Sequence, residues 1–260
     1  MKTFRKDLLT VRIFDSRAQM GAAAAEACAA EIRRQLAEKE EINMIFAAAP
    51  SQNEFLAALV ALGKSGAIDF GRINGFHMDE YIGLPADAPQ GFGNFLRERL
   101  FDLVPFKSVQ YLDCTAADPE TECARYTALL QQHPCDIICM GIGENGHIAF
   151  NDPHVARFDD DKWVKVVALD ETCRMQQVHD GCFASLEQVP THALTLTIPT
   201  LVRPSALFCM VPAATKANAV KMTVEGPVSE QCPASILRTR EHASLWLDPD
   251  SAALLEQAHV

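Results

Sequence analysis

Short apolar or β-branched runs alternate along this chain with longer amphipathic or alanine- and leucine-rich stretches. This alternation is typical of βα units built around a largely parallel sheet. It predicts strands at residues 9–14, 42–48, 72–78, 108–112, 136–141, 163–168, 192–198, 206–211 and 243–247, and helices at residues 16–38, 51–64, 92–101, 119–132, 213–224 and 249–257. No internal repeat or Pro/Gly/Ser linker interrupts the pattern. We therefore expect one α/β domain over residues 1–260, a three-layer α/β/α sandwich with a mostly parallel, Rossmann-like central sheet.

The charge balance narrows the classes of partner. There are 23 Lys and Arg residues against 34 Asp and Glu, which gives a formal net charge of −11. The chain has no basic tail or Lys/Arg run, and such runs supply most of the affinity for nucleic acid and for anionic membranes. Neither partner is expected, whereas a small molecule and a second copy of the chain remain open.

The cysteines and the N-terminal segment bear on the compartment. Nine cysteines form an odd set without a C-x-x-C pair, a usage typical of free thiols in a reducing compartment. The residues after the basic start are interrupted by charges and make no signal-peptide core. No apolar run approaches the roughly 20 residues of a membrane-spanning helix. We expect a cytoplasmic protein.

The densest motif is a glycine-rich loop that follows the predicted strand at residues 136–141. Its glycines spell G-x-G-x-x-G, and His147 comes directly after the last of them (Gly141, Gly143 and Gly146). A dinucleotide-binding loop should open a helix, but Pro153 intervenes before a helix has room, which disfavours that interpretation. The alternative is a glycine-rich turn that only reverses the direction of the chain, but this would not explain why His147, Asn151 and Asp152 lie in the same short loop. Glycines there let the backbone approach a ligand closely.

A second motif, Phe76-His-Met-Asp-Glu-Tyr-Ile-Gly, lies at the end of the strand that begins near residue 72. Two-residue alternation predicts His77 and Asp79 on one face, with Met78 and Glu80 on the other. The carboxyl ends of strands in an open α/β sheet are where such folds bind ligands. The plainer alternative is an acidic N-cap for the segment that follows.

A metal site built from two histidines and two carboxylates is conceivable (His77, Asp79, His147 and Asp152). No H-x-x-x-H pair or Cys/His cluster supports it. We therefore expect no metal.

Two strand-to-helix junctions offer candidates for binding an anion. Lys216 falls in the first turn of a predicted helix, where the helix dipole disfavours a cation, so an anion beside it is indicated. The alternative is an ordinary solvated lysine. At the other junction, Ser51 suits an N-cap and Glu54 would complete a capping box, which by itself explains both residues.

Together these residues resemble the glucosamine-6-phosphate deaminase (isomerase) family, which shares its fold with the 6-phosphogluconolactonases. The resemblance covers nearly the whole chain and rests on residues 78–85, 141–153, 193–201, Lys216 and 224–226. The stretch Gly-His-Ile-Ala-Phe-Asn at 146–151 is like the deaminases, since the lactonases typically have Gly-His-Thr-Ala-Ser there. This favours aldose–ketose chemistry over lactone hydrolysis.

The resemblance implies conversion of glucosamine 6-phosphate, or a closely related substrate, to fructose 6-phosphate and ammonia by base-catalysed enolisation, with no cofactor. It implies that Asp79 is the base that moves a proton from C2 to C1 and that His147 assists ring opening. Asn145 and Asp152 would orient the imidazole. The residues implied to bind the substrate and its phosphate are Ser51, Gly143, Arg174 and Lys216.

The chain departs from the family pattern at several positions. It reads Ala49-Pro-Ser where members usually have Gly-Gly-Thr, and proline contributes no N–H. It has Asn145 where many have Asp, and Asp152 where Glu is usual. The family's phosphate-binding arginine falls near residues 174–179, which makes Arg174 its candidate. The altered loop motivates an alternative function, a non-catalytic sugar-phosphate sensor, and 6-phosphogluconolactone hydrolysis is a third possibility.

Overall fold

The structure is a computed structural model that describes residues 1–256. Its central sheet has eight strands in the order β1-β2-β11-β10-β7-β3-β4-β6, and every pairing is parallel except that of β1 with β2. The strands are β1 (Lys2–Lys6), β2 (Leu9–Ile13), β3 (Ile42–Phe46), β4 (Ile73–His77), β6 (Ser108–Gln110), β7 (Ile137–Met140), β10 (Ala206–Val211) and β11 (Ala243–Leu247). A smaller antiparallel sheet joins β5 (Asp79–Tyr81), β9 (His192–Leu196) and β8 (Val164–Ala168). The expected mostly parallel sheet is confirmed.

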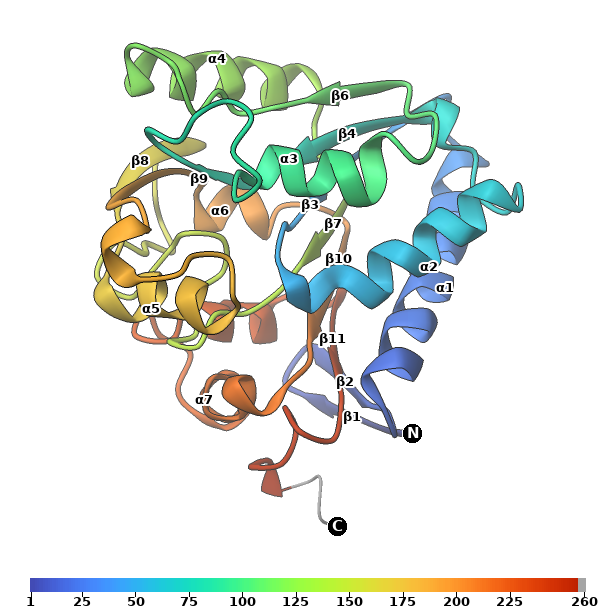
Figure 1. The fold of residues 1–260 in the computed structure, drawn as a ribbon. Coiled ribbons are helices and arrows are strands. Elements are labelled where there is room, and N and C mark those ends of the chain that lie inside the picture. The colour runs from blue at the N-terminus through green and yellow to red at the C-terminus, as the bar shows by residue number, and fades with distance from the viewer. Residues whose placement is uncertain (257–260) are drawn as a thin grey trace.

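Helices cover both faces of the large sheet (Figure 1). They are α1 (Arg17–Leu36), α2 (Asn53–Lys64), α3 (Phe92–Leu96), α4 (Pro119–Gln132), α5 (Glu171–His179), α6 (Ile198–Leu201) and α7 (Ala217–Glu225). One hydrophobic cluster lies between the sheet and α1, α2 and α3, and a second lies between the other face and α4, α6 and α7. None of the helices formed by residues 1–256 is long and apolar enough to cross a membrane.

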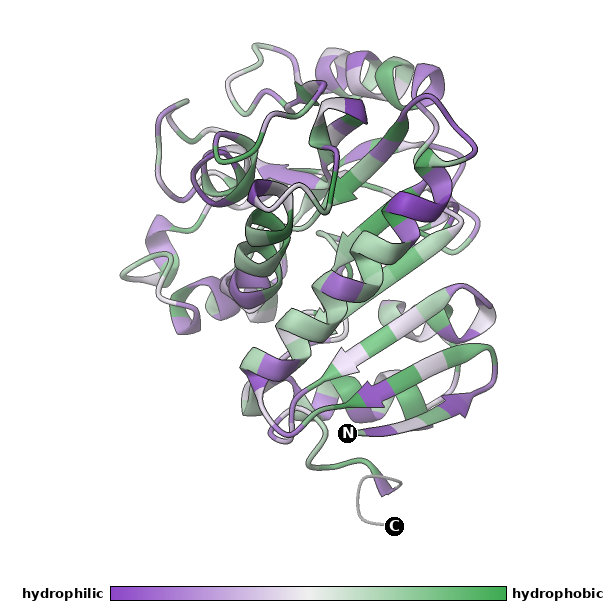
Figure 2. Cartoon of the chain, turned by 90° about the vertical axis from the view of Figure 1, so that its right-hand side faces the viewer, coloured by the Kyte–Doolittle hydropathy of each residue, from purple (hydrophilic) through white to green (hydrophobic). Residues whose placement is uncertain are grey.

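Alternation along the strands builds these two clusters. In β10, Phe208 and Met210 contribute to the first cluster, while Leu207 and Cys209 contribute to the second. Every residue of β10 is buried, as expected for a strand covered on both faces. Figure 2 shows the inner strands mainly in the colour of hydrophobic residues, with hydrophilic colour concentrated on the outer helices and loops.

The structure corrects several predicted elements. The strands expected at 163–168 and 192–198 exist, but they lie in the small antiparallel sheet, because an apolar run does not indicate which sheet it joins. The second of these ends at Leu196, and α6 follows with Pro199 in its first turn. Two predicted helices change their type along their length. The helix expected at 92–101 continues as a π-helix over Arg97–Phe101, and the helix expected at 213–224 begins with a 3-10 turn at Ala214–Lys216.

The helix predicted at 249–257 is wrong over the described residues, which form turns from 249 to 254. The Asp248 carboxylate accepts a hydrogen bond from the Ser251 N–H at 2.8 Å, and such a local bond competes with helix formation. Residue 257 lies outside the described residues. Pattern reasoning also missed β1, β5 and α5.

Candidate active site

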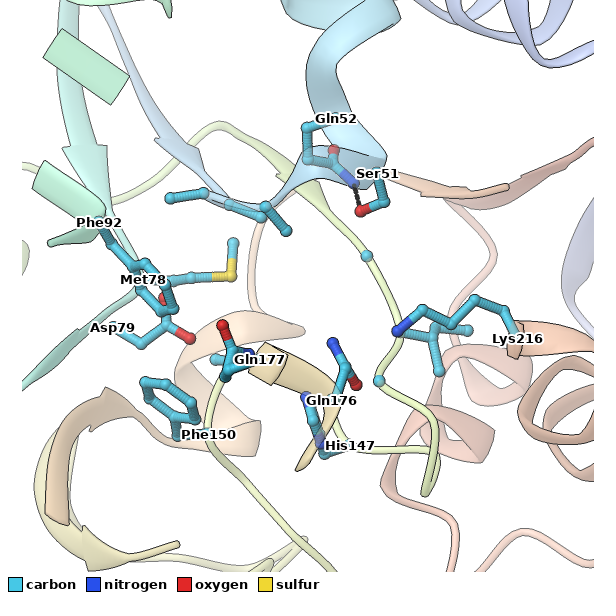
Figure 3. Close-up of a pocket in the computed structure, with 17 residues that line it drawn as sticks. Ser51, Gln52, Met78, Asp79, Phe92, His147, Phe150, Gln176, Gln177 and Lys216 are labelled. Carbon is cyan, nitrogen blue, oxygen red and sulfur yellow. Dashed lines mark hydrogen bonds between the residues drawn. The ribbon is translucent and has the colours of Figure 1, made fainter. Parts of the chain in front are cut away.

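A pocket opens at the carboxyl ends of β3, β4, β7 and β10, the edge where parallel α/β sheets bind ligands (Figure 3). It is formed by the segments that directly follow these strands, together with α3 and α5. The residues lining it are Ala47, Ala48, Ala49, Ser51, Gln52, Met78, Asp79, Phe92, Gly141, Ile142, Gly143, His147, Ala149, Phe150, Gln176, Gln177 and Lys216. Five of the eight predicted site residues therefore line one pocket: Ser51, Asp79, Gly143, His147 and Lys216.

Two oxygen atoms contact the His147 ring at Nδ1, the ring nitrogen on the opposite side from Nε2. Its Nδ1 lies 2.7 Å from Asn145 Oδ1 and 3.0 Å from Asp152 Oδ1. Because both oxygens accept, Nδ1 carries the proton and donates, which leaves Nε2 as an acceptor. The two other predicted site residues, Asn145 and Asp152, thus contact the imidazole without lining the pocket themselves.

The partners of His147 are fixed in turn. The Asn145 amide donates to Asp152 at 3.0 Å and to Asp170 at 3.1 Å. Asp152 is completely buried and also accepts from the Asp170 N–H at 3.2 Å. Burial opposes its ionisation, but the hydrogen bonds from His147, Asn145 and the Asp170 backbone prevail and lower the pKa of Asp152. A carboxylate is therefore present beside the imidazole at neutral pH.

Gly143 makes this arrangement possible. A β-carbon at residue 143 would stand 2.1 Å from His147 Cε1 and 2.2 Å from Nε2. The imidazole ring thus lies directly over the glycine α-carbon, and the Gly143 N–H donates to the His147 carbonyl at 2.9 Å.

Asp79 is the carboxylate that faces the pocket at the opposite side from Lys216 (Figure 3). It is 7% exposed. Burial, and secondarily the neighbouring Glu80, raises the pKa of Asp79 well above its usual range. Glu80 points elsewhere and accepts from the N–H groups of Phe92 and Gly93, so it caps the start of α3.

The alternation predicted across His77 and Asp79 is wrong, because a bend at Met78 separates β4 from β5. Met78 and Asp79 both line the pocket, while the His77 ring is turned away. Its Nδ1 bonds the Asp79 carbonyl and its Nε2 accepts from the Leu112 N–H, both at 2.9 Å. Burial lowers the pKa of His77 to about 4, so this imidazole is neutral.

His77 is therefore not part of a metal set with His147. Among the described residues, the ligand atoms of His147, Asp152 and Cys173 lie within 4.8 Å of one another, as do those of Asp152, His154 and Asp170. These are the two groups that could hold a metal ion.

Ser51 and Lys216, the two residues expected to bind an anion, both line the pocket. Ser51 lies within a 3-10 turn, Pro50–Gln52, and caps no helix; its Oγ accepts from Gln52 Nε2 at 3.1 Å. Glu54 instead pairs with Arg17 at 2.7 Å, so the capping box predicted for these residues is wrong.

Lys216 is only 4% exposed, and its ammonium makes no ion pair with residues 1–256. The alternative of a solvated lysine is therefore wrong. Burial lowers the pKa of Lys216. A buried ammonium without a carboxylate partner suits a site that receives an anion from solution.

Arg174 does not line the pocket. Its guanidinium donates to the carbonyls of Leu186 at 2.7 Å and Val189 at 2.9 Å, and it ties α5 to the segment that leads into β9. The helical period explains the difference, since Gln176 and Gln177 face the pocket and Arg174 lies on another face of α5. The expected phosphate contact from Arg174 is not supported by this geometry.

Comparison with known proteins identifies the relatives of this chain. A family model described as glucosamine-6-phosphate isomerases/6-phosphogluconolactonase matches residues 15–246. This chain belongs to that family. A protein from Listeria innocua serovar 6a, named glucosamine-6-phosphate deaminase, is 36% identical over 215 residues, 83% of this chain and 88% of the relative. A protein of the same name from Bacillus cereus is 34% identical over 195 residues, 75% of this chain and 72% of the relative.

Two solved structures share the fold of this chain. A structure described as a monomeric glucosamine-6-phosphate deaminase matches with a TM-score of 0.85 and 29% identity over 94% of this chain and 99% of its own. A 6-phosphogluconolactonase from Thermotoga maritima matches with a TM-score of 0.73 over 92% of this chain and 99% of its own. At 18% identity, the second likeness concerns the fold alone.

Sequence reasoning missed part of the pocket of this family member. Gln176 and Gln177 lie on α5, which has few apolar residues and therefore gives no amphipathic signal. Asp170, whose carboxylate accepts from the Cys173 N–H at 2.6 Å, is the N-cap that could have indicated this helix. Phe92 and Phe150, whose rings stack with centroids 5.4 Å apart, also line the pocket and were not among the predicted site residues.

Proposed function

We propose that this protein isomerises and deaminates an amino-sugar phosphate, converting glucosamine 6-phosphate or a close relative to fructose 6-phosphate and ammonia. The observation that carries the proposal is one pocket holding a shielded carboxyl group, an oriented imidazole and a buried lysine: Asp79, His147 and Lys216. The family and the names of the relatives from Listeria and Bacillus agree with it.

The proposed reaction starts with opening of the sugar ring. His147 Nε2, the acceptor nitrogen, takes the proton of the anomeric hydroxyl as the bond from C1 to the ring oxygen breaks, and the imidazolium returns this proton to the ring oxygen. The Asp152 carboxylate stabilises the transient imidazolium, and Asn145 keeps the ring in one orientation.

Enolisation follows on the open chain. The Asp79 carboxylate removes the C2 proton, and a double bond forms between C1 and C2 as the C1 carbonyl oxygen takes a proton from the ammonium on C2. The same carboxyl group then returns its proton to C1. Its raised pKa makes it a stronger base than an exposed aspartate. The nitrogen on C2 is then an iminium, to which water adds, and the adduct expels ammonia to leave the ketone. The sum is amino sugar plus water giving ketose plus ammonia.

The phosphate is assigned to Lys216 and Ser51. Lys216 supplies a positive charge in a protein of net charge −11, and the Ser51 hydroxyl adds a donor. Gly143 contributes by letting His147 reach the pocket. We further propose a single domain over residues 1–260 and a cytoplasmic location, which agrees with the free thiols of all nine cysteines.

The test is ammonia release by the purified protein across hexosamine 6-phosphates, with ketose 6-phosphate formation followed in the same reactions. We expect equal amounts of the two products from at least one substrate. Binding of the sugar phosphates by calorimetry without any product would favour the sensor. Hydrolysis of 6-phosphogluconolactone without ammonia release would favour the lactonase.

A further inference from the structure

The inward face of α5 is unusual because it is polar. The helix buries Cys173, Gln176 and Gln177, at the i, i+3 and i+4 positions that are apolar in most helices facing a core. Burying a carboxamide without a hydrogen bond costs about 1 to 3 kcal/mol. Both glutamines line the pocket, and the proposed chemistry has given neither of them a role.

Gln176 is held in one orientation. Its Oε1 accepts from the Glu144 N–H at 2.8 Å, and since only the oxygen of a carboxamide can accept, the NH2 group must lie on the other side. That NH2 group has one long contact, to Asp180 at 3.4 Å. Figure 3 shows its nitrogen directed into the pocket, between His147 and Lys216.

Gln177 is 7% exposed, and its side chain makes no hydrogen bond within residues 1–256. Figure 3 shows it between Asp79 and Gln176. A carboxamide offers two donors and an acceptor. These groups are unused within the described residues, and they line the pocket.

We propose that Gln176 and Gln177 bind the hydroxyl groups on the middle carbons of the sugar phosphate and thereby select among its epimers. The inference rests on the proposed function. In that function the reacting carbons lie at Asp79 and His147 and the phosphate at Lys216 and Ser51, so the glutamines face the carbons between them. A neutral carboxamide suits a hydroxyl, since both groups donate and accept hydrogen bonds. The phosphate dianion instead suits the positively charged Lys216.

The size of the effect follows from what one such contact contributes. A neutral hydrogen bond contributes a factor of about 2 to 13 in an equilibrium constant, and leaving its buried partner unpaired costs about as much again. Sites built to bind a hydroxyl reject the substrate that lacks it in the right place. We expect the enzyme to prefer one epimer by about 10-fold or more, and each glutamine to account for several-fold of that ratio.

The experiment compares kcat/KM for three epimers, the 6-phosphates of glucosamine, galactosamine and allosamine. The variants are Gln176→Leu and Gln177→Leu, with Gln132→Leu as the matched control, because Gln132 is an exposed glutamine on α4 outside the pocket. The pocket variants should lower kcat/KM for the preferred epimer most and reduce the ratio between epimers, while the control keeps the ratio. Thermal unfolding of each variant shows that it is folded.

Two outcomes overturn the inference. One is a wild-type enzyme that does not distinguish the epimers. The other is an equal loss with all three substrates in both pocket variants, which indicates a role in folding or pocket shape only.

Calorimetry with the 6-phosphates of glucose, galactose and allose separates this inference from the deaminase proposal, because these sugars have no amine. Epimer-selective binding that weakens in the leucine variants supports hydroxyl recognition even if no amino sugar releases ammonia. Absence of binding by any of the six sugar phosphates overturns both proposals.

Discussion

Replacing Gly143 by alanine tests whether the position of the His147 ring matters for catalysis. The added β-carbon would stand 2.1 Å from Cε1, whereas ordinary contact begins at 3.4 Å. The imidazole must therefore retreat by about 1.3 Å, the difference between these distances, which exceeds the roughly 0.5 Å within which a catalytic group keeps its productive geometry. A misplacement of about 1 Å can cost about 100-fold in rate.

We expect Gly143→Ala to lower kcat about 100-fold and to change KM much less, because Lys216 and Ser51 at the phosphate end are untouched. Ammonia release over a range of substrate concentrations measures both constants. The control is Gly71→Ala, an exposed glycine whose new β-carbon would meet only the side-chain oxygen of Asp69, at 3.2 Å.

A double-mutant cycle distinguishes an effect on His147 from general damage. If alanine at 143 acts by displacing the ring, adding it to His147→Gln should cost little more, since the group that it disturbs is already gone. A full additional 100-fold loss in the double variant would show that Gly143 acts elsewhere. Wild-type kcat in the single variant would refute the assignment of His147.

Two further substitutions probe the charged groups. Asp79→Asn should lower kcat at least about 1,000-fold while the protein stays folded. The folded-state pKa of Asp79 is raised, so the wild type loses stability as pH rises from the unfolded value of 3.8 through the folded one. The variant should lack that loss in urea titrations at several pH values, and wild-type turnover would remove Asp79 as the base. Lys216→Met should raise KM about 10- to 100-fold, because a charge-assisted contact to phosphate is lost. Its folded-state pKa is lowered, so wild-type stability should increase as pH rises through that pKa toward 10.5, and an identical pH dependence in the methionine variant would contradict this assignment.

The parallel core was predictable because each of its strands carries the signal within a few residues. The run at β10 is apolar throughout, and a strand buried on both faces requires that. The antiparallel partnership of β5, β8 and β9 was not predictable, because it depends on the bend at Met78, which turns β5 out of the line of β4. Pairing between segments far apart in the chain is a tertiary property that local pattern does not specify.

The site divides in the same way. Asp79, His147 and Lys216 lie in segments that follow strands of the parallel sheet, and the family resemblance of these segments assigned all three to one site from the sequence. Arg174 and the two glutamines lie on α5, and there the direction of each side chain decides its role. The sequence offered an arginine of the right charge nearby, but its guanidinium is taken by the carbonyls of Leu186 and Val189.

The polar groups of the pocket share one property that links its structure to its function. Asp79, Lys216 and Gln177 are each at least nine-tenths buried, and none of their side chains is paired with another charged or polar side chain among the described residues. Each is costly to bury alone, and the cost is offset by the two apolar clusters that hold the sheet and its helices. Since the three groups are complementary to a proton on carbon, a phosphate and a hydroxyl, a sugar phosphate would satisfy all of them at once. In the proposed function, the pocket is thus organised for its ligand before binding, and the stability that these groups remove from the empty protein is available as affinity.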